Sequence, residues 1–349
     1  MIKREIAVTE FIRTGSVLLD ASISIGKDKF GGVPTQRVAE FSGTGASGKT
    51  YICGEMCGDA IRKGHHVFVD DIERRWDLSR LDTFGIESGD KRFNYLDPSS
   101  NIEDCFARLF KLLEPPKSKK SKVRSRKVLY IIDPIAALWA KQELKSDKMS
   151  QARAKALQKH MRFLKDLVNY DPRFVNTVVF SNQLIDNVGG GLFSETKTTP
   201  GGNALVHWPS VRVRFNSAGK VTRKVKVGKK EFKKTIGVHI HGEVRKNSED
   251  DCFRTSDFSV RYGYGIDNIR DCGRYLKTHT TVLGKTPGWY QLPLSKKLKK
   301  KGVPKQKLRW QDFVGYIEQY NLEKRLFNLT RKAYKEWHKP EKRKPKVRD

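Results

Sequence analysis

A phosphate-binding loop is the clearest chemical signal in this sequence. The segment GTGASGKT fits the pattern G-x-x-x-x-G-K-[ST] and lies between a short apolar run and a helical pattern. Its glycines let backbone N–H groups curl around phosphates, Lys49 reaches the outer phosphates, and the Thr50 hydroxyl is suited to Mg²⁺. The residues predicted to bind a nucleotide are Gly43, Thr44, Gly45, Ala46, Ser47, Gly48, Lys49 and Thr50.

Acidic residues that close two apolar runs supply candidates for a metal ligand and a base. Asp133 ends LYIID, from where a carboxylate orients the water shell of Mg²⁺, so Thr50 and Asp133 are the predicted metal residues. The alternative is a strand-ending Asp that caps a turn. Glu73 is favoured as the base that orients attacking water, because its strand is expected to neighbour the strand before the loop. Asp70 and Asp71 compete with Glu73, and a solvated acidic turn is the alternative for all three.

A parallel sheet is the element that brings such residues together. Several continuous apolar runs end in polar residues and alternate with helical stretches at Ile102–Leu113 and Gln151–Asn169. This arrangement indicates an α/β fold with a mostly parallel central sheet and helices on both faces. Ligands bind at the carboxyl edge of such sheets, where the polar ends converge. The predicted strands are Val38–Phe41, His66–Val69, Val128–Ile132, Thr177–Phe180, Val211–Phe215 and Gly237–Val244.

The charge of the chain favours a polyanionic partner. Its 349 residues include 70 Lys and Arg against 39 Asp and Glu, a formal net charge of +31. Nucleic acid is the first candidate by counterion release, and a basic surface with no single partner is the alternative. With no apolar run of about 18 residues and no signal-peptide core, we expect a cytoplasmic protein without a membrane partner. The five cysteines have no C-x-x-C spacing, which indicates reduced buried thiols.

Composition divides the chain into four parts. Residues 1–12 are a short N-terminal segment, and residues 13–270 form the core. Residues 271–330 are predicted to form a small C-terminal α/β domain. The basic tail, residues 331–349, has nine Lys and Arg against three acids.

Two stretches of the core are predicted to be loops. Residues 115–127 contain seven basic residues and no acid, and we interpret them as a solvated loop. Residues 188–202 contain five glycines, and a long loop inside a compact domain is usually functional.

Further motifs resemble one known family. They are TGSVLLD (14–20), DIERRWD (71–77), IIDPIAAL (131–138), SNQ (181–183), TTPGGNAL (198–205), YGYGID (262–267) and GWY (288–290). With the phosphate-binding loop, they resemble the bacterial RecA and phage UvsX recombinases over about residues 11–292. The loop motif is generic, whereas GGNAL at this distance after NQ is specific. The resemblance implies a RecA-type P-loop ATPase core with ATP and Mg²⁺ as cofactors.

The resemblance also implies roles for individual residues. Glu73 would be the catalytic carboxylate beside Lys49, and Asp77 would lie near the adenine. Gln183 would sense the γ-phosphate and pass the signal to the adjacent loop. A glutamine that bonds only to loop backbone is the alternative. Lys246 resembles a lysine that the family supplies to the ATP of the neighbouring subunit.

Two segments become DNA-binding loops by the same resemblance, Lys141–Arg153 and Leu184–Gly202. Their cations offer phosphate contacts, and Phe193 would wedge between bases or fold back on the core. The predicted DNA-binding residues are Lys145, Lys148, Arg153, Phe193, Lys197, Gly201, Gly202 and Asn203.

The sequence departs from the family at several points. Pro134 stands where the family usually has Ser, and Ser248 stands where bacterial RecA has a second trans lysine, for which Arg245 is a substitute. About a dozen residues precede the core, so we expect no N-terminal helix of the bacterial kind. The tail is basic where that of bacterial RecA is acidic. These departures indicate a divergent member of the family; a phage-encoded member would act in the host cytoplasm.

The sequence therefore predicts a DNA-dependent ATPase of homologous recombination and DNA repair. It would form a helical filament of identical subunits on single-stranded DNA, then pair it with duplex DNA and promote strand exchange. Single-strand-binding or loader proteins are possible further partners. One alternative is an accessory ATPase or helicase-like ring motor of the same fold. The other is a non-catalytic ATP-binding protein that coats single-stranded DNA.

Overall fold

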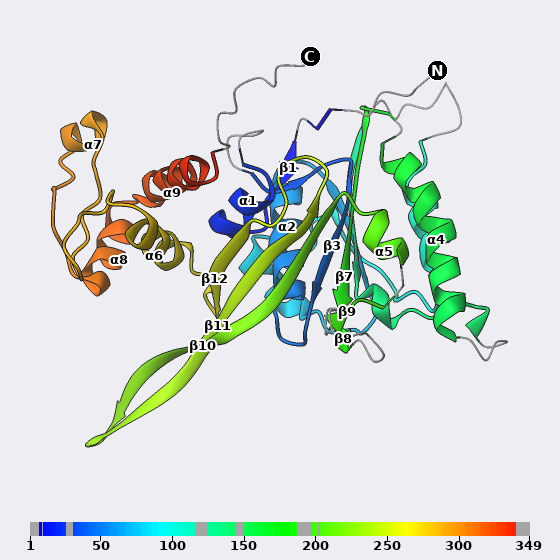
Figure 1. Ribbon diagram of the computed structural model, residues 1–349, viewed down its shortest axis with the longest axis horizontal. Coiled ribbons are helices and arrows are strands. Elements are labelled where there is room, and N and C mark those ends of the chain that lie inside the picture. The colour runs from blue at the N-terminus through cyan, green and yellow to red at the C-terminus, as the bar shows by residue number, and fades with distance from the viewer. Residues whose placement is uncertain are drawn as a thin grey trace, which may run out of the picture. The chain divides into compact units, whose positions relative to one another are not determined.

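The computed structural model contains two compact units, Met1–Ile266 and Asp267–Asp349, here called the core unit and the C-terminal unit (Figure 1). It describes residues 7, 8, 10–25, 31–115, 125–143, 149–169, 171–186, 197–200 and 203–339. Composition set the corresponding boundary at residue 270, and the contacts set it after Ile266.

A large sheet organises the core unit. Its central strands are β3 (Val38–Gly43), β4 (His66–Asp71), β5 (Phe93–Tyr95), β6 (Arg126–Asp133) and β7 (Phe174–Gln183), and its outer strands are β10 (Val211–Val227), β11 (Lys230–Asn247), β12 (Thr255–Arg261) and β13 (Gly265–Ile266). Within the described residues the order is β13-β12-β11-β10-β3-β7-β6-β4-β5. Pairs from β10 to β5 are parallel, and pairs from β10 to β13 are antiparallel. The predicted fold class is confirmed.

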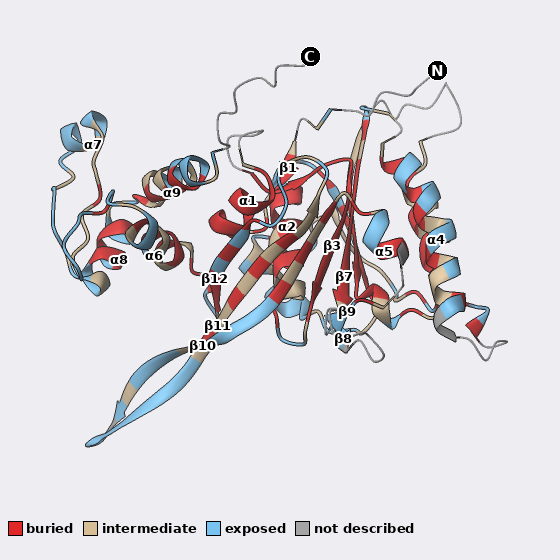
Figure 2. Cartoon of the chain, in the orientation of Figure 1, coloured by how far each residue is buried: buried red, intermediate tan, exposed pale blue. Residues whose placement is uncertain are grey.

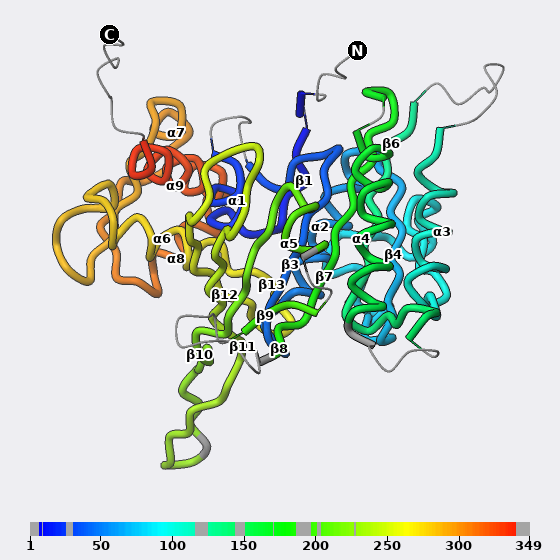
Figure 3. The backbone as a smooth tube through the Cα atoms, turned by 45° about the vertical axis from the view of Figure 1, so that its right-hand side comes forward, coloured from blue at the N-terminus to red at the C-terminus, as the bar shows by residue number. Residues whose placement is uncertain are grey.

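Helices cover both faces of this sheet. One face carries α1 (Val17–Ile23) and α2 (Lys49–Arg62), and the other carries α3 (Ile102–Leu113), α4 (Met149–Val168) and α5 (Asn203–His207). Figure 3 shows α3 and α4 side by side, where Phe106 stacks on His160 with ring centroids 5.0 Å apart. Burial on both sides explains why the central strands are continuous apolar runs rather than alternating ones.

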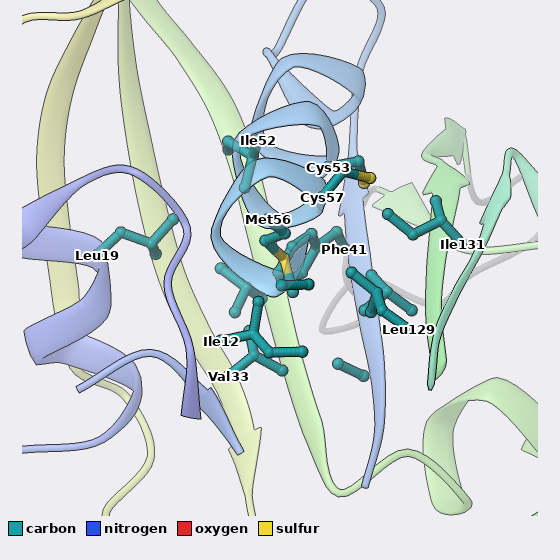
Figure 4. Close-up of a cluster of buried hydrophobic side chains, with 14 of the residues drawn as sticks. Ile12, Leu19, Val33, Phe41, Ile52, Cys53, Met56, Cys57, Leu129 and Ile131 are labelled. Carbon is teal, nitrogen blue, oxygen red and sulfur yellow. The ribbon is translucent and has the colours of Figure 1, made fainter. Parts of the chain in front are cut away.

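The core on the α2 side holds the phosphate-binding loop in place. Phe41 of β3 packs against Ile52 and Met56 of α2, together with Leu129 and Ile131 of β6 (Figure 4). All five side chains are completely buried. The loop between β3 and α2 is therefore fixed at both ends by one apolar cluster.

The strand order corrects one expectation from the sequence. The strand before Glu73, β4, was expected to neighbour the loop strand β3. In the structure β6 and β7 lie between them, so β4 pairs with β6 and β5. Glu73 must reach the nucleotide loop through the turn after Asp71 rather than by strand pairing.

The outer strands β10 and β11 are longer than predicted. The expected ranges ended at Phe215 and began at Gly237, whereas the two strands continue as an antiparallel ribbon to Val227 and from Lys230. Exposed charged residues break the apolar pattern there, so the only strand signal is the recurrence of valine and threonine along β10.

The C-terminal unit differs from the predicted α/β domain. Its described residues form α6 (Asn268–His279), α7 (Lys296–Lys300), α8 (Trp310–Gln319) and α9 (Glu323–Trp337). An isolated bridge joins Tyr290 to Leu308. Its core is aromatic, with Tyr275 of α6 stacked on Tyr334 of α9 at 5.5 Å between ring centroids.

Short elements connect the main ones in the described residues. They are β1 (Phe11–Ile12), β2 (Val33–Pro34), η1 (Leu78–Phe84), η2 (Ile135–Ala137), β8 (Ile185–Asp186) and β9 (Lys197–Thr198). Of the five cysteines, which were expected to be buried, Cys252 is exposed and the other four are buried. No helix in the described ranges is long and apolar enough to cross a membrane.

A buried ion pair connects three neighbouring strands of the sheet. Glu40 of β3 is fully buried, and its carboxylate accepts bonds from Arg212 Nε of β10 at 2.5 Å and Asn182 Nδ2 of β7 at 2.8 Å. Because all three side chains are removed from most solvent, breaking this network leaves a charge without compensation.

We expect Glu40→Ala to lower the free energy of unfolding by about 3 kcal/mol, since the largely buried Arg212 would lose its carboxylate partner. Glu40→Gln should cost less because the amide oxygen can still accept one bond. Urea unfolding followed by circular dichroism measures both. The matched control is Glu336→Ala, which removes an exposed pair with Lys332 at 3.9 Å and should change stability little. Equal effects at both positions would contradict the role of burial.

Candidate functional site

The loop between β3 and α2 has the backbone geometry of a phosphate cradle. Gly48 caps α2 in the left-handed region with φ of 81°, and a Cβ there would lie 2.5 Å from Ile240 Cδ1. Ala46 also has a positive φ of 57°. These turns direct successive N–H groups of the loop and the first turn of α2 to one side, where the helix dipole favours an anion.

Lys49 lies inside this cradle. Its Nζ donates to the carbonyl oxygens of Gly43 at 3.0 Å and Thr44 at 2.9 Å. Burial lowers the pKa of Lys49, while the nearby Asp133 carboxylate opposes that shift. The Lys49 ammonium is thus held by weak, neutral acceptors. A negatively charged phosphate oxygen would be a stronger acceptor and would take their place.

A cavity of about 330 Å³ opens in front of the loop. Residues 45–51 form one wall, and residues from the carboxyl ends of β4, β6 and β7 form the other. This second wall consists of Asp71, Glu73, Arg75, Asp133, Pro134, Ser181 and Gln183. The polar residues therefore converge at the carboxyl edge of the sheet as the sequence predicts.

Asp133 is fixed by two donors from other segments. Trp76 Nε1 donates to Oδ2 at 2.9 Å, and the Ser181 hydroxyl donates to Oδ1. The register of β6 and β7 pairs Ile132 with Phe180, so Asp133 and Ser181 follow as neighbours. Ser181 thereby supplies a hydroxyl beside Asp133, although Pro134 occupies the position where a serine was expected.

The three acids after β4 separate into two environments. Asp70 is fully buried and accepts bonds from Ser99 N at 2.9 Å and Tyr130 Oη at 3.2 Å, away from the cavity. Asp71 and Glu73 both line the cavity. Asp71 Oδ2 accepts from Tyr95 Oη at 2.9 Å, and its buried Oδ1 has no hydrogen-bond partner among the described residues. Asp70 is therefore a structural residue, and Asp71 is an additional candidate in the site.

Glu73 is joined directly to the end of β7. Gln183 Nε2 donates to Glu73 Oε1 at 3.0 Å, and Arg75 Nε lies 3.1 Å from Glu73 Oε2. The side chains of Glu73 and Gln183 come from segments 110 residues apart. Their bond places a carboxylate and an amide together opposite Lys49, which is the arrangement needed to hold water near a terminal phosphate.

Comparison with known proteins assigns this chain to a family. Residues 2–267 match the RecA N-terminal domain family. The chain belongs to the RecA family. Protein RecA of Campylobacter fetus is 28% identical over 300 residues, which cover 84% of this chain and 77% of that protein. Protein RecA of Rickettsia prowazekii is 28% identical over 288 residues, covering 80% and 75%. The resemblance to RecA-like recombinases is confirmed.

Two RecA-family assignments lie outside this cavity. Asp77 is exposed and caps η1, where its Oδ1 accepts from Ser79 N at 3.1 Å, so its place near an adenine stays a prediction. Lys246 of β11 donates to the carbonyl oxygens of Val206, at 3.5 Å, and His207. Burial, with Arg212 nearby, lowers the pKa of Lys246. Lys246 does not line the nucleotide cavity of its own chain.

Most residues assigned to the two RecA-type DNA loops are outside the described residues. Lys145, Lys148, Phe193, Gly201 and Gly202 belong to this group, and Asn203 begins α5 with its side chain undescribed.

Two of the assigned cations are described. Arg153 Nε lies 3.0 Å from Glu143 Oε1, a partner that a DNA phosphate would have to displace. Lys197 is exposed on β9 and lines a second cavity of about 270 Å³ with Arg212, Arg214 and Arg245. Lys197 therefore lies where it can meet an anion, whereas Arg153 already has an ion-pair partner in its own chain.

Sequence reasoning did not assign Trp76 or Ser181 to the site, and it weighed Asp71 only as a competitor of Glu73. Trp76 has no motif of its own, since its role depends on the turn that returns it to Asp133. Ser181 carried a partial signal, because it follows the predicted strand 177–180 as Asp133 follows the predicted strand 128–132. Polar residues at the ends of two parallel strands converge at one edge of the sheet, although the sequence does not show that these two strands are neighbours.

Glu55, one turn after the cavity residue Tyr51 on α2, gives a pH test of the packing around α2. Burial raises the pKa of Glu55 to about 7 from an ordinary value of 4.5. Its contribution to stability is therefore fully present below about pH 4.5 and is lost as the pH rises through 7. We expect the stability of Glu55→Gln relative to the wild type to be higher at pH 8 than at pH 5, measured by thermal unfolding. Exposed Glu87→Gln is the control, and a pH-independent difference for Glu55→Gln would contradict the expectation.

Proposed function

We propose that this chain is a DNA-dependent ATPase that assembles on single-stranded DNA and promotes homologous pairing and strand exchange. Membership of the RecA family supports a recombinase and ATPase role in recombination and repair. The observation that carries the finer proposal is the bond from Gln183 to Glu73, at the end of the strand that leads to the glycine-rich segment.

The cavity fits ATP with Mg²⁺. The loop N–H groups and Lys49 would hold the phosphates, and Thr50 and Asp133 would meet the metal. Asp71 Oδ1, buried with no hydrogen-bond partner in the described residues, supports a cation or its water at this point. Mg²⁺ prefers one or two carboxylates with phosphate oxygens and water, which matches this set of donors. When bound, Mg²⁺ neutralises charge on the transferred phosphate.

The residues opposite Lys49 would control hydrolysis. Glu73 would orient the attacking water, and Arg75 and Gln183 hold its carboxylate in the cavity. A γ-phosphate that draws Gln183 away from Glu73 would free the carboxylate for water and pull on the segment after β7. One contact would thus connect the nucleotide state with DNA binding.

Assembly would complete the site. Lys246 is outside the cavity of its own chain and bonds only weak carbonyl acceptors in the contacts described, which suits a cation presented to the ATP of a neighbouring subunit. The partners would be further copies of this chain, single-stranded DNA and then duplex DNA. Single-strand-binding or loader proteins remain a prediction from the sequence.

We expect Lys49→Ala to abolish ATP turnover while DNA binding is kept, because Lys49 would contact phosphate in the cavity and the basic surface lies elsewhere. Phosphate released from ATP measures turnover, and fluorescence anisotropy of labelled single-stranded DNA measures DNA binding. Lys111→Ala on α3, which removes one exposed lysine, is the control and should leave both unchanged. Turnover that survives in Lys49→Ala would contradict the assignment.

Glu73→Gln and Gln183→Ala should separate ATP hydrolysis from its stimulation by DNA. We expect Glu73→Gln to bind ATP normally and to lose about 10²–10⁴-fold in turnover, because the base is gone. Gln183→Ala should keep DNA-independent turnover and lose its stimulation by single-stranded DNA. Phosphate release with and without DNA distinguishes the two, and equal stimulation in wild type and Gln183→Ala would reject the switch.

The proposal as a whole is tested on the wild-type protein. ATP turnover should rise with single-stranded DNA, and electron micrographs with an unhydrolysable ATP analogue should contain helical filaments. Closed rings with ATP-driven unwinding would instead support a ring motor. ATP binding without any turnover would support a coating protein.

A further inference from the structure

One tryptophan bonds two carboxylates at the carboxyl edge of the sheet. The backbone N–H of Trp76 donates to Asp71 Oδ2 at 2.8 Å, and its indole Nε1–H donates to Asp133 Oδ2 at 2.9 Å. Asp71 and Asp133 are paired residues at the ends of the neighbouring strands β4 and β6. Both line the nucleotide cavity, whereas Trp76 lies behind its wall. Trp76 therefore acts on the cavity through these two side chains.

The turn after β4 brings Trp76 back to the strand that the chain has just left. Arg74 has a left-handed backbone with φ of 53°, and its N–H donates to the Asp71 carbonyl at 3.2 Å. Glu73 and Arg75 of this turn line the cavity, and Trp76 packs against the apolar core on the α2 side. A residue with a side chain keeps a positive φ only where the surrounding structure holds it. The bond from Trp76 N to Asp71 closes the turn and supplies part of that hold.

The two carboxylates lie at a buried edge of the sheet. Asp71 is 1% exposed and Asp133 is 5% exposed. The central strands β3 and β7 of the same sheet are buried along almost all of their length (Figure 2). Two neighbouring carboxylates with little solvent repel each other and need hydrogen-bond donors to stay ionised. Trp76 supplies one donor to each of them.

These bonds leave acceptor positions on both acids. Asp71 Oδ2 accepts from Trp76 N and from Tyr95 Oη, while Oδ1 has no hydrogen-bond partner among the described residues. On Asp133, Trp76 holds Oδ2 and the Ser181 hydroxyl holds Oδ1, which fixes the plane of the carboxylate. An ionised carboxylate has about four acceptor positions, so each acid can still bind a cation or its water.

We propose that Trp76 is a positioning residue, whose two N–H groups set Asp71 and Asp133 as a pair for the Mg²⁺ that accompanies the nucleotide. Mg²⁺ is usually bound by one or two carboxylates together with phosphate oxygens and water. Hydrogen bonds to a metal-binding carboxylate orient it, and their loss typically weakens metal binding by about 10–100-fold. The proposal rests on the proposed function for its choice of ATP with Mg²⁺ as the ligand.

Trp76→Phe in the full-length protein tests the proposal, because phenylalanine keeps an aromatic ring and removes only the indole N–H. Binding of Mn²⁺ together with ADP, measured from the electron paramagnetic resonance of free Mn²⁺, should weaken by about tenfold. ADP binding in the presence of EDTA should stay within twofold of wild type. The Mg²⁺ concentration for half-maximal ATP turnover should rise by a similar factor, whereas kcat at saturating Mg²⁺ should fall less than threefold.

Trp310→Phe in the C-terminal unit is the matched control, because it removes the indole N–H of another partly buried tryptophan. Its Mn²⁺ affinity should equal that of wild type. If Trp76 only packs against the core, Trp76→Phe will lower the thermal stability and leave the Mn²⁺ affinity unchanged, which would overturn the proposal. Equal weakening of Mn²⁺ binding in the two variants would overturn it as well.

A measurement on the wild type is independent of how well Trp76→Phe folds. The protein has six tryptophans, which 5-fluorotryptophan labels for ¹⁹F nuclear magnetic resonance. Mn²⁺ with ADP should broaden the Trp76 resonance most, because its indole bonds Asp133, and Mg²⁺ with ADP should shift that same resonance. ADP alone should not shift it. A resonance that does not respond to Mg²⁺ would contradict the coupling of Trp76 to the metal.

Failure of the proposed function would look different. ATP turnover of the wild type would then not respond to single-stranded DNA. The Mn²⁺ and ¹⁹F measurements contain no DNA, so they decide the role of Trp76 separately.

Discussion

The candidate nucleotide site depends on the register between β6 and β7. That register places Asp133 beside Ser181, whose hydroxyl fixes one carboxylate oxygen while Trp76 fixes the other. A slip of one residue would turn Ser181 to the opposite face of the sheet, toward the core under α3 and α4 and away from the cavity. The geometry of the cavity therefore follows from strand pairing, and the phosphate-binding loop alone does not create it.

Much of the fold could be predicted because its signals are local. The strand cores, the loop from Gly43 to Thr50 and the polar strand ends all appear as patterns within a few residues. Strand order could not be predicted in the same way, because no local pattern in the apolar run before Glu73 indicates which strands pair with it. The choice between Asp70 and Asp71 had the same limit: adjacent strand residues face opposite sides, but the sequence does not state which side holds the cavity.

The candidate site was predicted best where chemistry requires particular residue types, as at Lys49, Asp133, Glu73 and Gln183. It was predicted least well where another side chain competes for the same group. Arg153 looks like a phosphate contact in sequence, yet Glu143 holds it at 3.0 Å. Such partners are brought together by the fold and leave no trace in residue spacing. The exposed ribbon of β10 and β11 was not predicted for a related reason. Its many charged residues leave no apolar alternation from which strands could be inferred.

The buried bond from Asn182 to Glu40 limits where the chain can bend. Asn182 immediately precedes Gln183, and Leu184 N donates to the Gly43 carbonyl at 3.2 Å. The backbone is thus anchored on both sides of the residue proposed to feel the γ-phosphate. Gln183 can change its rotamer while its own backbone stays in place. A contact with the γ-phosphate would therefore reach the chain after Leu184 through the side chain of Gln183, and not through movement of the β7 backbone.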